Sequence, residues 1–434
     1  MRTGQRFDVA GAFLSSARFV TALTTATVGT AACSFALRQT IGWAGLLGIL
    51  GGLLALFALV LFMKRGEIEW SGLLPISLLV FVGWAVVSIF WSQYQWATLG
   101  SLIYFLAFTI LGVAVALLRD TIQIVRAFGD VLRFTLLASL VAEIVSGLLI
   151  DSRIRFLDVV GNIDQFGPIQ GILGTRNQLG IVAIVAIVTF ATELRTKSIA
   201  RGLGIGSVVL AALCLLMSQS PVAAGATVLV GFATLALYGL RRVAPENRRF
   251  WQFGLLGTAI VVAVLAWVFR TPIIDTLDAT SDLGYRLDLW RRVWDLIPLH
   301  SLEGWGWIGI WRQDIAPFLA FRFMPGGAPD SAANALLDVW FQLGLVGILA
   351  LAVLVSLAFV RSWLLAAQRR SVVFTWPALV LLALILTSLA ESSLLVEFGW
   401  LTLVACTVKA SRELSWRQAF ATAPEAPVLP HQPA

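Results

Sequence analysis

Runs of about twenty apolar residues recur along the whole chain and are separated by shorter polar stretches. A run of this length lets a helix cross about 30 Å of hydrocarbon. Lipid cannot hydrogen-bond an open backbone, so each run predicts a membrane-spanning helix. We therefore expect an all-α fold, a polytopic membrane helical bundle of about twelve transmembrane helices. The expected spans are residues 19–37, 41–63, 70–91, 96–118, 134–150, 177–194, 202–218, 222–240, 250–269, 334–360, 373–390 and 394–409.

The polar segments between these spans divide the chain into four parts. Residues 1–269 should hold nine transmembrane helices and a smaller outer loop at 151–176. Residues 270–333 form a large loop that is too long for a simple connection. Residues 334–410 should hold the last three spans. The tail at 411–434 is rich in alanine and proline, and we expect it to be disordered.

The large loop should contain an amphipathic helix that lies along the membrane surface. Ser281 or Asp282 can cap the start of this helix, and Pro298 limits its end. Between them, apolar side chains recur at three- and four-residue spacing, which is typical of one helix face. The residues of this stripe are Leu287, Trp290, Trp294 and Ile297.

The composition and the charge pattern support a membrane protein and orient it. The chain is 59% hydrophobic and 13% charged, about half the charged share of a soluble domain. If the N-terminus is cytoplasmic, 21 of the 31 basic residues fall on the cytoplasmic side, as the positive-inside rule requires. We expect a multi-pass protein of the cytoplasmic (inner) membrane, with both termini cytoplasmic and the long loops extracytoplasmic. The net charge of +7 then reflects orientation in a lipid bilayer, and no nucleic acid partner is expected.

All three lysines fall on the cytoplasmic side, so every basic residue outside is an arginine. Arginine grips phosphate or carboxylate with a fixed, two-pronged donor group. Codon usage explains the same asymmetry equally well. The three cysteines lie within predicted spans, and their spacing predicts neither a disulfide framework nor a metal site.

Arg176 and Asn177 stand where the smaller outer loop meets the sixth span. A helix that starts near Asn177 presents free amides and the positive end of its dipole, which favour an anion. The pair can clamp a phosphate or pyrophosphate. The alternative is an interfacial arginine that merely extends its head into water.

The amphipathic helix offers Arg286, four residues before Trp290, as a second arginine over the same site. Arg291 is a weaker candidate because Asp288 can pair with it at helical spacing. His300 is an available base near neutral pH, although a lone histidine is more often an ordinary loop residue.

A polar cluster marks the start of the tenth span. Asp330, Asn334 and Asp338 are spaced four residues apart, so they share one face if the helix extends back to Asp330. Asp338 would lie about one turn into the span and should need a partner, for which an outer-loop arginine is the expected one. A structural cap with a buried hydrogen bond is the alternative for this cluster.

Three blocks in this order resemble the O-antigen ligase and polysaccharide polymerase family of integral membrane glycosyltransferases. They are GILGTRNQLG, YRLDLWRRVWDLIPLHSLEGWGWIGIW and SAANALLDVWFQLGLVG, and the likeness extends from about residue 173 to residue 350. The resemblance implies transfer of a glycan without metal or cofactor. The donor would be a polyprenyl-pyrophosphate-linked glycan, and the acceptor another lipid-linked molecule or glycan. Arg176 and Arg286 match the basic positions of the family, which would stabilise the departing pyrophosphate.

Ala333 stands where the family has the histidine thought to act as the base, and alanine cannot accept a proton. The chain could use Asp330, Asp338 or His300 instead. It could also be a non-catalytic relative that binds lipid-linked glycan, or an engineered inactive form. In each case we expect the guanidinium groups of Arg176 and Arg286 to converge beside Asn334.

Two other functions remain open at this stage. A secondary transporter or lipid flippase would fit twelve spans and the membrane-level carboxylates Glu143, Glu391 and Glu397. However, the chain shows no two related halves of the kind that transporters often have. A non-catalytic scaffold of envelope glycan assembly would also explain the missing histidine.

Overall fold

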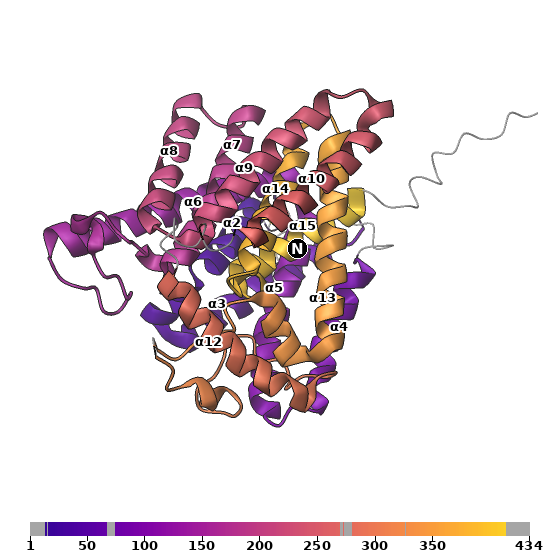
Figure 1. Cartoon of the computed structure of the whole chain (residues 1–434). Coiled ribbons are helices and arrows are strands. Elements are labelled where there is room, and N and C mark those ends of the chain that lie inside the picture. Colours follow the sequence, from indigo (N-terminus) through magenta and orange to yellow (C-terminus); the bar gives the residue numbers. More distant parts are fainter. Residues whose placement is uncertain are drawn as a thin grey trace, which may run out of the picture.

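The computed structural model describes residues 16–66, 74–269, 280–325 and 327–413, together with Leu14 and Pro272. Across these residues the chain is built of helices and contains no β-strand beyond one isolated bridge, between Ile154 and Val159 (Figure 1). The α-helices are α2 (Ala17–Ala32), α3 (Ser34–Met63), α4 (Ile76–Val87), α5 (Gln95–Leu118), α6 (Thr121–Ile144), α7 (Arg176–Thr196), α8 (Arg201–Ser218), α9 (Pro221–Arg242), α10 (Arg248–Val268), α12 (Thr280–Leu296), α13 (Ala335–Gln368), α14 (Thr375–Ser388) and α15 (Glu397–Glu413). Shorter turns join them, namely η1 (Ser88–Phe90), η2 (Val145–Leu149), η3 (Asn162–Gln165), η4 (Gly171–Leu173), η5 (Pro245–Asn247), η6 (Ile297–His300), η7 (Phe318–Phe321), η8 (Val372–Phe374) and η9 (Ser393–Leu395).

The length and composition of the helices confirm a multi-pass membrane protein. Within the described residues, eight helices are long and apolar enough to cross a membrane, and two shorter apolar helices cover Ile76–Phe90 and Val372–Ser388. The expected total of about twelve spans is not confirmed. The predicted disordered tail lies outside the described residues, apart from its first three positions, which end α15.

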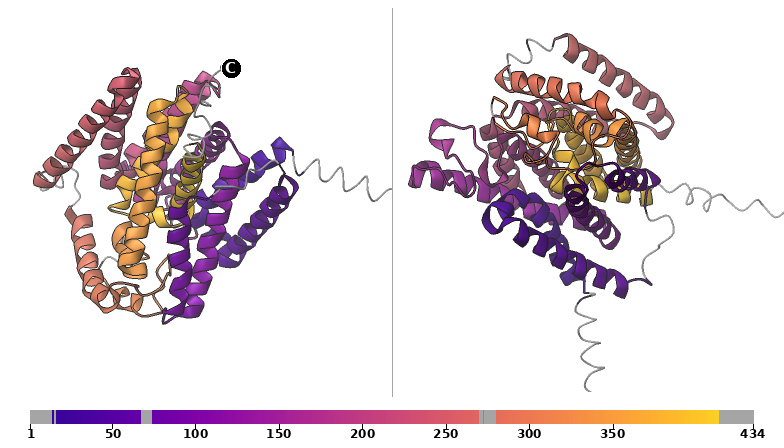
Figure 2. Two further views of the ribbon diagram at one scale, coloured as in Figure 1. Left: turned by 90° about the vertical axis from the view of Figure 1, so that its right-hand side faces the viewer. Right: turned by 90° about the horizontal axis from the view of Figure 1, so that it is seen from below.

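The interior of the bundle is formed by the helices that are buried on most sides. Figure 2 shows α15 inside the bundle, and almost every residue of α14 and much of α7 is buried as well. Aromatic rings fill the space between α4, α5 and α15, where Trp400 packs against Phe105 at 4.6 Å and Phe81 at 5.5 Å. Peripheral helices α8, α9 and α10 instead expose large apolar side chains, which suits a surface covered by lipid.

One predicted inner loop is a helix. We expected the fifth span at 134–150, but α6 begins at Thr121, so residues 121–133 are helical. Asp120 and Gln123 form a reciprocal capping box that starts the helix. The charges that made this segment look like a loop are satisfied by packing, since Arg133 forms an ion pair with Glu193 of α7.

The tenth predicted span, at 334–360, is not one straight helix. Within α13, Gly344 adopts φ 66° and ψ −167°, which divides the helix into two segments. A side chain is excluded there, because a Cβ atom would approach the carbonyl oxygen of Leu302 to 2.1 Å. A similar break at Gly42 lies within α3, so the expected connection at 38–40 is helical.

Two features fix the segments that carry the candidate site. The buried carboxylate of Glu143, at the end of α6, accepts backbone N–H groups of Gly161 at 3.0 Å, Gln170 at 2.9 Å and Gly171 at 2.8 Å. It thereby holds the loop that leads into α7. The helix expected from Ser281 is present as α12, which lies at the lower end of the bundle in Figure 1.

Candidate functional site

The first turn of α7 presents Arg176 and Asn177. Thr175 caps this helix, since its side chain accepts the N–H of Gln178 at 3.1 Å. Arg176 forms an ion pair with Asp282 in the first turn of α12. Asn177 donates its amide to Glu391 Oε1 at 2.7 Å and accepts the hydroxyl of Ser220 at 2.7 Å. The start of α7 is therefore tied to both α12 and the α14–α15 connection.

Arg286 reaches the same carboxylate from α12. Its Nη2 atom donates to Glu391 Oε1 at 2.7 Å, and its Nη1 atom donates to the backbone oxygens of Ala333 and Ala390. Arg286 is buried and only 9% exposed. Asp282 and Arg286 are four residues apart on α12, so the ion-pair partner of Arg176 lies one helical turn from Arg286.

Glu391 is therefore the centre of the cluster. Its Oε1 atom accepts two hydrogen bonds, one from Asn177 and one from Arg286. These two residues are more than 100 positions apart in the chain. Burial raises the pKa of the Glu391 carboxyl, and the positive charge of Arg286 opposes that rise. Arg176 pairs with Asp282 and Arg286 pairs with Glu391, so each guanidinium faces a carboxylate. The convergence of the two guanidinium groups beside Asn334 stays a prediction.

The segment 331–334 is held in place from α12. Arg286 donates to the carbonyl of Ala333 at 3.2 Å, and Trp290 donates its indole N–H to the carbonyl of Ala332 at 2.9 Å. Arg286 and Trp290 are four residues apart and therefore share one face of α12, so they can donate hydrogen bonds to the successive carbonyls of Ala333 and Ala332. The indole N–H of Trp290, which is the only donor of this side chain, is used in this contact.

Ala333 itself has φ 48°, in the left-handed region. Non-glycine residues rarely adopt this conformation, but asparagine, aspartate and histidine are enriched there. The backbone at this position therefore accommodates a histidine without a change of conformation.

The expected ridge of Asp330, Asn334 and Asp338 on one helix face is wrong. Asn334 is the N-cap of α13, and its side chain accepts the N–H groups of Leu336 at 3.0 Å and Leu337 at 3.1 Å. Because the asparagine cap starts the helix, Asp330 stays outside it.

Asp338 is buried and forms no ion pair with an arginine among the described residues. It is 1% exposed and accepts the indole N–H of Trp311 at 2.8 Å and the side-chain amide of Gln342 at 2.7 Å. The outer-loop arginine expected as its partner is thus replaced by two neutral donors. Gln342 in turn accepts the backbone N–H groups of Ile308 and Gly309. Through Gln342, Asp338 therefore stabilises the segment GWGWIGIW at residues 304–311.

Asp330 is exposed and lies near the cluster. Its backbone oxygen accepts the N–H of Trp311 at 2.8 Å. Burial raises the pKa of Tyr285, and the charge of Asp330 adds to that rise; the same charge also opposes ionisation of Glu391. Asp330 therefore places an accessible carboxylate three residues from Ala333.

His300 and Arg291 are not brought into this cluster. His300 pairs with Glu303 at 2.9 Å, and its hydrogen bond lowers the pKa of Glu303. The backbone oxygen of the next residue, Ser301, accepts the N–H of Leu345 just beyond the break in α13, about 16 Å along the helix from Asn334. The side chain of Arg291 is 76% exposed and pairs with Asp288.

Sequence reasoning missed the carboxylates that hold the arginines. In the sequence, Glu391 is an ionisable residue between two apolar runs. Such a residue is compatible with a transporter as well as with a binding site. Asp282 was expected to act as a helix cap. Within the described residues, no three histidine, cysteine or acidic side chains are grouped as ligands for a metal ion.

The fold and the site define a helical membrane protein with a charged cluster at one end of the bundle. Residues 206–352 match the family model described as O-antigen ligase, which supports assignment of the chain to the O-antigen ligase family. The second and third sequence blocks lie within these residues, and the first block lies before them. That family implies lipid-linked glycan substrates in a membrane. No curated protein matches the chain.

Proposed function

We propose that the chain is a membrane glycosyltransferase of the O-antigen ligase type. It transfers a glycan from a polyprenyl-pyrophosphate donor to a lipid-linked or glycan acceptor. The observation that carries this proposal is the convergence of Asn177 and Arg286 on one oxygen of Glu391. Arg176 pairs with Asp282, which lies one helical turn from Arg286 on α12. Asn177 and Arg286 come from separate segments and already bind an anion, the Glu391 carboxylate.

Transfer breaks the bond between the anomeric carbon and the pyrophosphate, which leaves with its negative charge. Arg176, Arg286 and the amides at the start of α7 stabilise this charge, as preorganised donors do in other enzymes. Asp282 and Glu391 hold the arginines in position before the donor binds. The donor pyrophosphate then replaces Glu391 as the partner of Arg286.

The new bond forms when an acceptor hydroxyl attacks the anomeric carbon and loses its proton. Asp330 is the base in this proposal, because it is exposed and three residues from Ala333, whereas Asp338 is buried and its Oδ1 atom already accepts from Trp311 and Gln342. The effect of a positioned base on rate is typically about 100- to 10,000-fold.

The same proposal sets the membrane topology. The chain crosses the cytoplasmic membrane about twelve times, with spans in residues 1–269 and 334–410. The 270–333 loop covers the site on the extracytoplasmic side, both termini are cytoplasmic, and residues 411–434 form a cytoplasmic tail. The distribution of basic residues supports this orientation.

Arg286→Ala tests the arginine clamp. We expect transfer to fall by at least about 100-fold, the size of effect seen when one preorganised donor is removed. Arg291→Ala is the matched control, because Arg291 lies on the same helix but is exposed and paired with Asp288. Glycan transfer by the purified chain, together with donor affinity, is measured. Unaltered transfer and donor affinity in Arg286→Ala would contradict the proposal.

A second candidate is a non-catalytic protein that binds lipid-linked glycan, and Ala333 favours it because alanine supplies no base. Ala333→His distinguishes the two, since the left-handed backbone accepts histidine. If Asp330 is the base, Asp330→Asn abolishes transfer, and Ala333→His restores it in that background. If the chain is a binder, it shows no transfer, and Asp330→Asn leaves donor affinity unchanged. Asp314→Asn, an exposed carboxylate paired with Arg312, is the control.

A further inference from the structure

A second cationic site lies at the other end of α7 from Arg176. There a cavity of about 470 Å³ opens between the first turns of α6, the connection from α7 to α8, and the start of η8. We call it the α6–α7–η8 cavity. It is an open depression, and the cationic side chains that line it are exposed. None of the residues singled out for glycan transfer lines it.

The cavity is lined by three cations and by no carboxylate. Arg126 comes from α6, and Arg195 and Lys197 come from the end of α7 and the residue that caps it. In the part of the chain that the structure describes, none of the three forms an ion pair. Glu193, the nearby acidic group that interacts with Arg126, is bound by Arg133 instead.

Local contacts hold these cations at the cavity wall. Arg126 donates to the backbone oxygen of Ser198 at 3.0 Å, which links α6 to the α7–α8 connection. The guanidinium of Arg195 stacks 4.3 Å over the ring of Tyr238. Lys197 ends α7 in a left-handed conformation, with φ 53° and its N–H bonded to the last turn. The hydroxyl of Ser198 already donates to Glu193, so the cations and Ser371 are the donors that face a ligand.

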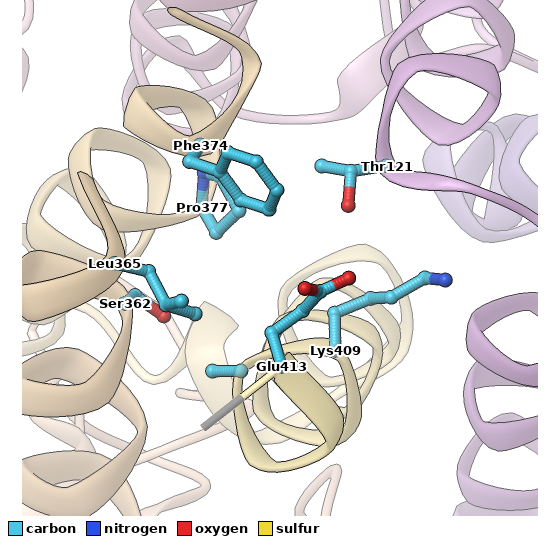
Figure 3. Close-up of a pocket in the computed structure, with 8 residues that line it drawn as sticks. Thr121, Ser362, Leu365, Phe374, Pro377, Lys409 and Glu413 are labelled. Atoms are coloured by element: carbon cyan, nitrogen blue, oxygen red, sulfur yellow. The ribbon is translucent and has the colours of Figure 1, made fainter. Parts of the chain in front are cut away.

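The carboxylate of Glu413 does not line the α6–α7–η8 cavity and so does not neutralise its cations. Figure 3 shows Glu413 directed into a separate slot between Thr121 and Phe374. That slot has a volume of about 10 Å³, room for one water molecule at most. The larger cavity is therefore the place where a ligand fits.

We propose that the α6–α7–η8 cavity binds a phosphate group. Three unpaired cations in one cavity favour an anion with concentrated charge, and the arginine donor pattern matches phosphate oxygens. The cavity lies between the end of α7 and the start of η8, next to the ends of the expected spans at 177–194 and 373–390. An anionic phospholipid and a soluble phosphate compound share this chemistry. The proposal is independent of glycan transfer and holds for either orientation of the bundle.

The test uses the full chain, purified in uncharged detergent and stripped of lipid. Native mass spectrometry measures binding of phosphatidylglycerol, with diacylglycerol as the probe that lacks phosphate. Thermal unfolding measures binding of inorganic phosphate against chloride at equal ionic strength. The variant Arg126→Gln, Arg195→Gln, Lys197→Gln removes the three cations. The control Arg201→Gln, Arg242→Gln, Arg249→Gln removes three exposed arginines at the same end of the bundle, outside the cavity.

We expect the wild type and the control to bind a phosphate probe, and the cavity variant to lose at least about tenfold in affinity. Loss of phosphatidylglycerol binding alone identifies a lipid headgroup, and loss of the phosphate-induced shift alone identifies a soluble phosphate compound. The proposal is overturned if the cavity variant binds both probes as the wild type does. It is also overturned if the control loses as much affinity as the cavity variant, or if diacylglycerol binds as tightly as phosphatidylglycerol.

Discussion

Glu391 should determine how tightly an anion binds to Arg286, because its carboxylate already occupies that guanidinium. One of its oxygens accepts hydrogen bonds from both Asn177 and Arg286, and burial raises the pKa of this carboxyl. A pyrophosphate group that binds as proposed must therefore compete with the carboxylate of Glu391. At the scale of single residues, the charge on Glu391 should set the affinity of the site.

Glu391→Gln should raise the affinity for inorganic pyrophosphate by roughly threefold to tenfold, because it leaves the charge of Arg286 without an anionic partner. Isothermal titration calorimetry measures this affinity. Asp288→Asn is the control, since Asp288 is an exposed carboxylate on the same helix as Arg286. Equal or weaker binding in Glu391→Gln would show that Glu391 does not occupy the anion position.

The same residue gives a pH dependence. The pKa of Glu391 in the folded state lies above its unfolded value, so protonation favours the folded state. Its stabilising effect is present below the unfolded pKa and is lost as the pH rises through the folded pKa. As the pH falls through that folded value, the wild type loses the competing charge and should approach the pyrophosphate affinity of Glu391→Gln.

At the scale of elements, the spacing of residues on α12 and the loop before α7 position the site. Arg286 and Trp290 are one turn apart and bind successive carbonyls, so a short helical motif fixes segment 331–334. Glu143 does the same for the loop that ends at Arg176, through three backbone N–H groups.

Glu143→Gln should loosen this loop. Glu143 Oε1 accepts the backbone N–H groups of Gln170 and Gly171, and Oε2 accepts the backbone N–H of Gly161. In a glutamine, one of these oxygens is replaced by an NH2 group, which is a donor and would face a backbone N–H donor. We expect a loss of about 1–3 kcal/mol in the free energy of unfolding and faster proteolysis within 151–175. Donor KM should rise because Arg176 follows this loop. Asp164→Asn, an exposed acid of the same loop, is the control and should behave as wild type. Unchanged proteolysis in Glu143→Gln would refute this role.

At the scale of the whole molecule, the two cationic sites lie at opposite ends of the bundle. The glycan-transfer cluster is at the start of α7, and the α6–α7–η8 cavity is at its end. In a membrane-spanning bundle these ends face different compartments.

Labelling with a membrane-impermeant maleimide tests this arrangement. Asp288→Cys on α12 should react in intact spheroplasts, whereas Glu246→Cys, between α9 and α10, should react only after permeabilisation. The unmodified chain is the control, because Cys214 and Cys406 are buried and Cys33 is partly buried. Reaction of both variants in intact spheroplasts would contradict the topology.

Several features followed from the sequence alone. Apolar runs predicted a helical membrane protein, since hydrocarbon requires internally bonded backbone. The amphipathic spacing after Ser281 predicted α12, and three ordered blocks predicted the family. Each of these patterns lies within one segment of the chain, so each prediction can be made without knowledge of contacts to distant residues.

Other features were decided only by tertiary structure. The sequence could not show that Glu391 faces Arg286, that Trp311 and Gln342 surround Asp338, or that packing on α7 makes residues 121–133 helical. The reason is physical: whether a buried charge is satisfied depends on groups distant in the chain, and only the folded bundle brings them within hydrogen-bonding distance.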